Sequence, residues 1–208
     1  MVAKKPKGMG PAKDKLDLAD ANKLTDHLWI GGELDSADRA MALGQLDEIV
    51  DAGIDSIIDC RIESTDIDWV TEAKAHIDYL SAGVEDAGYV MPDDWWFDGT
   101  TYALDQISEG HVVFVHCQVG INRGPSMGFA ILVAMGWDPI EALNLIRERR
   151  PIARVAYAEQ AIDWWLQSVG APDEAAVTQI RRIKQWRIEN DIPRGAEMID
   201  RGKSDPVD

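Results

Sequence analysis

A cysteine and an arginine at the two ends of one short loop constrain this chain more than any other feature. Cys117 and Arg123 enclose the residues Gln-Val-Gly-Ile-Asn. The segment 111–115 before them, His-Val-Val-Phe-Val, is apolar and rich in β-branched residues, which is typical of a buried strand. The segment 125–135 after them begins with proline, is largely apolar and is followed by Gly136, as in a helix with favourable start and stop residues. The sequence therefore predicts a strand, a loop and a helix in succession.

A loop in this position is suited to bind a phosphate group. Backbone N–H groups and the positive end of the helix dipole point to one place there, and both stabilise a phosphate dianion or a thiolate. A thiolate at a helix N-terminus beside a cation is a nucleophile at neutral pH, so Cys117 is a candidate catalytic residue. Arg123 can hold two phosphate oxygens in a bidentate fork, which lysine cannot. Gly120 fits a loop position that needs a positive φ or a close approach to a ligand.

The pattern His-Cys-x-x-Gly-x-x-Arg at residues 116–123 resembles the signature loop of the protein tyrosine phosphatase superfamily, in particular its small dual-specificity branch. Further segments similar to that branch are residues 28–32, 57–59 and 150–152. The resemblance implies hydrolysis of phosphoproteins, with tyrosine or dual specificity, through a phosphocysteine intermediate. It implies neither a metal nor another cofactor. Strands that alternate with helices also favour an α/β fold, with a central, mainly parallel sheet of about four or five strands covered by helices on both faces.

The resemblance also requires an aspartic acid on a separate loop, which protonates the leaving oxygen and later activates water. Asp86 lies in the glycine-rich stretch 82–88, after an apparent strand that ends at Tyr79, and this is where the family places its acid. Asp93 and Asp94 follow a proline and precede three aromatic residues, so they are typical of first-turn residues that stabilise a helix dipole. We therefore favour Asp86 as the general acid.

Two positions depart from the family pattern and leave two other functions open. Gly124 stands where the family usually has serine or threonine, whose hydroxyl helps the cysteine leave from phosphate; the nearest hydroxyl is that of Ser126. A catalytically weak phosphate-binding module is therefore one alternative. Asn122 resembles the corresponding residue of the related RNA 5′-triphosphatases, so a phosphatase acting on RNA 5′ ends is the other.

The remaining candidate site residues surround Cys117. The resemblance assigns His116 to supporting the loop and tuning the thiol, without proton transfer. Cys60 ends the strand expected at 56–60 and is a candidate redox partner for the catalytic thiol, although a buried apolar role is the simpler interpretation. Arg61 either faces the mouth of the site or pairs with Glu63. The loop residues expected to bind substrate are Gln118, Val119, Gly120, Ile121, Asn122 and Arg123.

Composition narrows the choice of substrate. The formal net charge is −16, and lysines concentrate in the first 15 residues, so the rest of the 208-residue chain is more acidic still. Such a surface disfavours nonspecific binding to nucleic acid or to an anionic membrane. The loop 118–122 carries no lysine to hold several phosphates, which favours a singly phosphorylated protein side chain as substrate. No apolar run approaches the roughly 18 residues of a membrane span, and a mechanism that needs a free thiolate suits the cytoplasm.

Three regions are expected along the chain. Residues 1–22 are rich in Lys, Pro, Gly and Ala and predict a disordered basic arm. Residues 23–170 predict the phosphatase domain, and residues 171–208 a C-terminal helical extension and tail. The helix expected at 173–190 either packs on the domain or forms a dimer or partner contact. The other expected elements are strands at 28–30, 56–59 and 112–116 and helices at about 36–52, 92–107, 125–135, 139–149 and 156–169.

Overall fold

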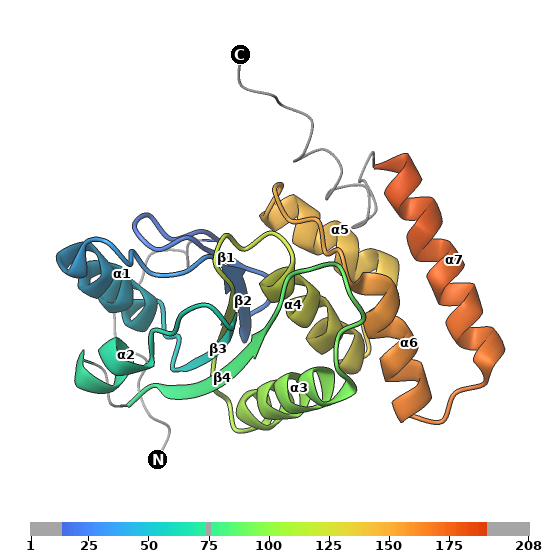
Figure 1. Ribbon diagram of the computed structural model, residues 1–208, viewed down its shortest axis with the longest axis horizontal. Coiled ribbons are helices and arrows are strands. Elements are labelled where there is room, and N and C mark those ends of the chain that lie inside the picture. Colours follow the sequence, from blue (N-terminus) through green and yellow to red (C-terminus); the bar gives the residue numbers. More distant parts are fainter. Residues whose placement is uncertain (1–13, 74–75, 191–208) are drawn as a thin grey trace, which may run out of the picture.

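The computed structural model describes residues 14–73 and 76–190, which form a five-stranded sheet with helices on both sides (Figure 1). The strand order is β1-β2-β5-β3-β4. The strands are β1 (Ala21–Lys23), β2 (Leu28–Gly31), β3 (Ser56–Arg61), β4 (Asp78–Val84) and β5 (Val113–His116). All neighbouring strands run parallel except β1, which pairs antiparallel with β2 at the sheet edge. The expected α/β fold with a mainly parallel sheet is confirmed.

Alternating side chains on the central strands form two apolar layers. Ile30, Ile58 and Val115, which lie at matching positions on β2, β3 and β5, belong to one cluster of buried residues. Trp29 and Phe114, which pair with each other one position earlier, belong to the other. Both faces of the sheet are therefore covered, as the continuous apolar runs of buried parallel strands require.

The helices follow the expected order. They are α1 (Arg39–Asp51), α2 (Ile67–Ala73), α3 (Asp93–Ser108), α4 (Arg123–Ala134), α5 (Pro139–Arg149), α6 (Ala158–Ser168) and α7 (Asp173–Glu189). In Figure 1, α1 and α2 lie on one side of the sheet, and α3 to α6 lie on the other. Local capping sets two of the starts: the carboxylate of Asp38 accepts from the N–H groups of Ala40 and Met41, and that of Asp138 accepts from Ile140 and Glu141.

The N-terminal segment differs from the expected arm. Within the arm proposed at residues 1–22, residues 14–22 are part of the folded body. Leu16 and Ala19 are buried, and the backbone of Lys15 forms an isolated antiparallel β-bridge with Asn22. The carboxylate of Glu48 on α1 accepts three backbone N–H groups from residues 17–19 at 2.7–2.9 Å. The abundance of lysine and the small number of apolar residues in this segment predicted disorder, because the hydrogen bonds to Glu48 leave no local pattern in the sequence. Residues 1–13, and the tail at 191–208, lie outside the described part of the chain.

The C-terminal helix α7 packs on α5 and α6 (Figure 1). Ile183 and Trp186 are buried there, and the indole N–H of Trp186 donates to the side chain of Asn144 on α5 at 2.7 Å. The inward face of the helix is thus covered by its own domain, while the expected dimer or partner contact stays a prediction. Among the described helices, none has the length and apolar character needed to span a bilayer.

Candidate active site

The loop between β5 and α4 lies at the carboxyl ends of the parallel strands. Cys117 follows β5 directly, is 3% exposed, and donates its N–H to the carbonyl of Gly31 at 3.4 Å. Arg123 begins α4. The predicted strand, loop and helix are therefore present, and the loop opens at the edge of the sheet where α/β proteins bind ligands.

The carbonyl groups of the loop are bound by its surroundings. Five consecutive carbonyls, those of Gln118, Val119, Gly120, Ile121 and Asn122, accept hydrogen bonds from Glu33 N, Arg150 Nη2, Arg150 Nε, Arg154 N and Ser126 N, respectively. Since these carbonyls turn outward, the loop can present its N–H groups inward, at the start of α4. That is the arrangement by which backbone nests and helix N-termini bind an anion.

Gly120 and Arg150 fit together at the middle of this loop. Gly120 has φ +63°, so the expectation of a positive φ is confirmed. A Cβ atom at this position would lie 2.4 Å from Arg150 Nη2 and 2.5 Å from the carbonyl oxygen of Gly31. Arg150 is itself buried and paired with the carboxylate of Asp20, at 2.6 Å in the shorter contact. Its guanidinium therefore supports the loop from behind, outside the inner side that would face a ligand.

Arg123 is buried and its guanidinium is only partly bound. Nη1 and Nη2 each donate to one carboxylate oxygen of Glu63 at 2.7 Å, and Nη1 also donates to the carbonyls of Val84 and Cys60. Hydrogen bonds from Arg123 lower the pKa of Glu63 to about 2. Nε is buried and makes no hydrogen bond within the described residues; a carboxylate oxygen of Asp86 lies 3.8 Å from it. One fixed donor of Arg123 is therefore unused.

Asp86 lies beside Arg123, on the loop between β4 and α3. Its Oδ1 accepts the hydroxyl of Tyr157 at 2.6 Å, and its Oδ2 is 3.5 Å from Nδ2 of Asn122. Burial, with the Asp86 contact next, raises the pKa of Tyr157, so the tyrosine is a neutral donor. The other two candidates, Asp93 and Asp94, are exposed in the first turn of α3.

His116 is buried behind the nucleophile, stacked on Phe114, with Nε2 3.8 Å from a carboxylate oxygen of Asp59. Burial lowers the pKa of His116 and so favours a neutral ring, although the nearby carboxylate of Asp59 acts in the opposite direction. Its supporting role stays a prediction. A buried neutral ring between strand and carboxylate is in keeping with that role.

Cys60 and Arg61 at the end of β3 have separate surroundings. Cys60 and Cys117 are both free and buried, and burial, then the nearby Cys117, raises the pKa of Cys60. The redox role of Cys60 stays a prediction. Arg61 does not pair with Glu63; it binds Asp59, Asp66 and Glu33 at 2.7–2.8 Å. Glu63 is thereby left to Arg123.

Three residues of the site lacked a functional signal in the sequence. Glu63 and Tyr157 stand in segments without a pattern, and their roles depend on contacts across 60 and 71 residues of chain. Arg150 was part of a segment similar to the dual-specificity branch, which marked its position without its role. Only the fold brings these side chains to Arg123, Asp86 and the loop.

Comparison with solved structures agrees with this geometry. The chain has the fold of the solved dual-specificity phosphatases. A crystal structure of PTPMT1 in complex with PI(5)P matches with a TM-score of 0.59 and 21% identity, over 73% of this chain and 99% of that one. Tk-PTP in its active form matches at 0.55 and 18%, over 71% and 95%. Human DUSP28 matches at 0.53 and 14%, over 81% and 95%. No protein-family model and no curated protein matches the sequence.

Proposed function

We propose that the protein is a cysteine-dependent phosphatase that hydrolyses phosphomonoesters on proteins through a phosphocysteine intermediate. The observation that carries the proposal is the unused Nε–H of Arg123, buried beside the outward-turned loop carbonyls and next to Asp86. A buried donor without a partner is costly, and a bound oxyanion would satisfy it. The fold of the solved phosphatases supports the proposal.

The proposed reaction uses three side chains, those of Cys117, Asp86 and Arg123. The thiolate of Cys117 attacks phosphorus, and a bond forms between sulfur and phosphorus as the ester bond breaks. Protonated Asp86 gives its proton to the leaving oxygen, which departs as an alcohol or phenol. The carboxylate of Asp86 then takes a proton from water, whose oxygen attacks phosphorus and releases Cys117 and inorganic phosphate. Loop N–H groups and Arg123 hold the equatorial oxygens in both steps.

The charges at the site favour a singly phosphorylated substrate. Arg123 is approached by the carboxylates of Glu63 and Asp86, and loop residues 118–122 are uncharged. A triphosphate or a polyphosphorylated headgroup would place further negative charges near these carboxylates at an unfavourable Coulomb energy. A phosphorylated protein side chain brings one phosphate, so it is the substrate class we propose over RNA 5′ ends.

The covalent step is tested with Cys117→Ser. We expect hydrolysis of an aryl phosphate to be abolished, since a serine hydroxyl is a far weaker nucleophile than a thiolate, while orthovanadate or phosphate binding, measured by calorimetry, persists on the loop amides and Arg123. Normal turnover by Cys117→Ser would exclude the phosphocysteine intermediate. A wild-type protein that binds phosphate and never hydrolyses an aryl phosphate would instead be the weak phosphate-binding module.

The general acid is tested with Asp86→Asn, with Asp94→Asn as the matched control. Loss of the acid should slow esters with poor leaving groups by about a hundredfold and esters with good leaving groups far less, because the latter need no proton. Asp94→Asn should leave both rates unchanged. The reverse pattern would move the acid to α3. A preference for a triphosphorylated RNA end over a phosphotyrosine peptide would overturn the proposed substrate class.

A further inference from the structure

The turn at residues 154–157, between α5 and α6, contacts both the phosphate loop and the proposed general acid. The N–H groups of Arg154 and Val155 both approach the carbonyl of Ile121 in the phosphate loop, at 2.9 and 3.4 Å. The hydroxyl of Tyr157 holds Asp86, and its N–H donates to Ser126 in the first turn of α4 at 3.3 Å. One turn therefore holds the loop, the start of α4 and the acid.

This turn has an unfavourable backbone of its own. Val155 has φ +50°, the left-handed region, where a β-branched residue is a clear outlier. Such a conformation persists only where the surrounding structure imposes it. The turn therefore needs support from outside the loop that it holds.

Arg187 on α7 provides that support. Its Nη1 donates to the carbonyl of Arg154 at 3.0 Å and its Nη2 to the carbonyl of Val155 at 2.6 Å. Nε and Nη2 also donate to the two carboxylate oxygens of Glu159 on α6, both at 2.8 Å. The side chain of Arg187 is 3% exposed, so its buried guanidinium is held by these four hydrogen bonds.

We propose that Arg187 is a positioning residue, through which α7 holds the 154–157 turn and so fixes the phosphate loop at Ile121 and the acid at Asp86. The proposal rests on the proposed phosphatase function for its kinetic consequences. Attachment of α7 does not itself need a buried charge, because Ile183 and Trp186 already bury apolar surface against the domain. The two carbonyl bonds are the contacts that only a multidentate donor such as arginine supplies.

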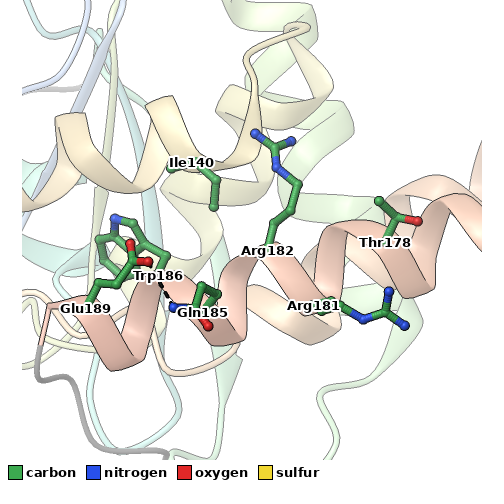
Figure 2. Close-up of a pocket in the computed structure, with 7 residues that line it drawn as sticks. All are labelled: Ile140, Thr178, Arg181, Arg182, Gln185, Trp186 and Glu189. Carbon is green, nitrogen blue, oxygen red and sulfur yellow. Dashed lines mark hydrogen bonds between the residues drawn. The ribbon is translucent and has the colours of Figure 1, made fainter.

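Three variants separate positioning from simple packing. Arg187→Gln removes the carbonyl bonds and the ion pair. Glu159→Gln removes the ion pair and leaves the bonds to Arg154 and Val155. Arg182→Gln is the matched control: this arginine lies on the same helix, extends toward α5 near Ile140 as Figure 2 shows, and pairs with Asp138 in a half-exposed contact at 2.7 Å.

The kinetic expectation is specific. Arg187→Gln should lower kcat for an ester with a poor leaving group about tenfold more than for one with a good leaving group, because a displaced Tyr157 no longer orients the acid. Glu159→Gln should have a smaller effect, and Arg182→Gln none. Arg187→Lys should recover part of the loss, since an ammonium can still reach a carbonyl. Equal loss for both esters, proportional to the unfolded fraction, would reduce Arg187 to a structural residue and overturn the proposal.

Amide hydrogen exchange tests the same coupling without catalysis. In Arg187→Gln the N–H groups of Arg154 and Val155, which hold Ile121, should exchange about tenfold faster than in the wild type, beyond what the change in global stability measured by urea unfolding accounts for. Arg182→Gln should show wild-type exchange. Unchanged exchange in Arg187→Gln would overturn the proposal even in an active enzyme. Faster exchange in Arg187→Gln, together with a wild-type protein that hydrolyses no aryl phosphate, would instead retain the coupling and refute the phosphatase function.

Discussion

Gly124, the first residue after the arginine, is packed against the nucleophile's own backbone. A Cβ atom there would lie 3.1 Å from the carbonyl carbon of His116 and 3.2 Å from the nitrogen of Cys117. These are backbone atoms of a buried strand end, which cannot give way as a side chain can. The glycine therefore lets α4 approach β5 closely. Any side chain at this position would displace the backbone that carries the Cys117 thiol, whatever hydrogen bond the side chain could offer.

Gly124→Ala should consequently destabilise the protein by about 1–3 kcal/mol, as overpacking in a core does, and should lower kcat. Gly124→Ser should show the same loss, partly offset if its hydroxyl reaches the sulfur. Urea unfolding and aryl phosphate kinetics measure the two effects. Gly44→Ala on α1 is the control: its nearest contact would be 3.8 Å away, so it should stabilise the helix by about 0.5–1 kcal/mol. A stable, faster Gly124→Ser would show that the missing hydroxyl outweighs the crowding.

Among the elements, β3 carries a charge cluster from its last residue into the core. The side chain of Arg61 is 1% exposed and binds three carboxylates, those of Asp59, Asp66 and Glu33. Burial is the largest single effect and raises the pKa of Asp59, but the hydrogen bonds from Arg61 and Tyr79 and the nearby positive charge together outweigh it, so the net pKa is lowered. Tyr79 on β4 also donates to Asp59, at 2.6 Å. This network fixes the end of β3 beside His116.

Arg61→Gln should cost about 3–5 kcal/mol in the free energy of unfolding, because it leaves buried carboxylates without their cation. Chemical denaturation at pH 7 gives the value. Arg39→Gln provides the comparison, since the Arg39–Glu72 pair is exposed and should contribute about 1 kcal/mol or less. Similar losses in the two variants would mean that Asp59 and Asp66 find other partners or bind protons at low cost.

Regular elements were more predictable than the contacts between them. The apolar run of β5 and the helix expected at 139–149 are local features, and both appear where the sequence predicted them. Residues 14–22 were not predictable in this way, because their order depends on Glu48 and on Asp20 pairing with Arg150. The strand expected to end near Tyr79 runs to Val84, since alternating exposed and half-buried residues at an edge give a weak apolar signal. Pairs that are distant along the chain leave no local pattern.

At the scale of the whole molecule, net charge and individual carboxylates act on stability in opposite directions. At the formal charge of −16 at pH 7, the excess negative side chains repel one another in the folded state, and this repulsion diminishes as pH falls toward the isoelectric point near 4.5. Hydrogen bonds lower the pKa values of Glu63 and Asp138 in the fold, with Arg123 and Arg182 the largest causes. Protonating such carboxylates removes native contacts. A falling pH therefore first stabilises the fold by reducing charge repulsion and then destabilises it by breaking these contacts.

The expected result is a stability maximum on the acid side of neutrality. Glu63 contributes fully above its ordinary pKa of 4.5, and its contribution is lost as pH falls toward about 2. His111, whose pKa is raised by the hydrogen bond to Asp55, contributes fully below 6.5 and is lost as pH rises through that raised pKa. The thermal midpoint should therefore rise from pH 8 to between about 5 and 6 and fall below about 4, as measured by calorimetry. Added salt at about 0.5 M should flatten the alkaline side by screening the net charge, and His111→Asn should reduce that slope further. A midpoint that stays constant from pH 8 to 5.5 at low salt would mean that neither self-repulsion nor the His111–Asp55 pair affects the stability of the fold.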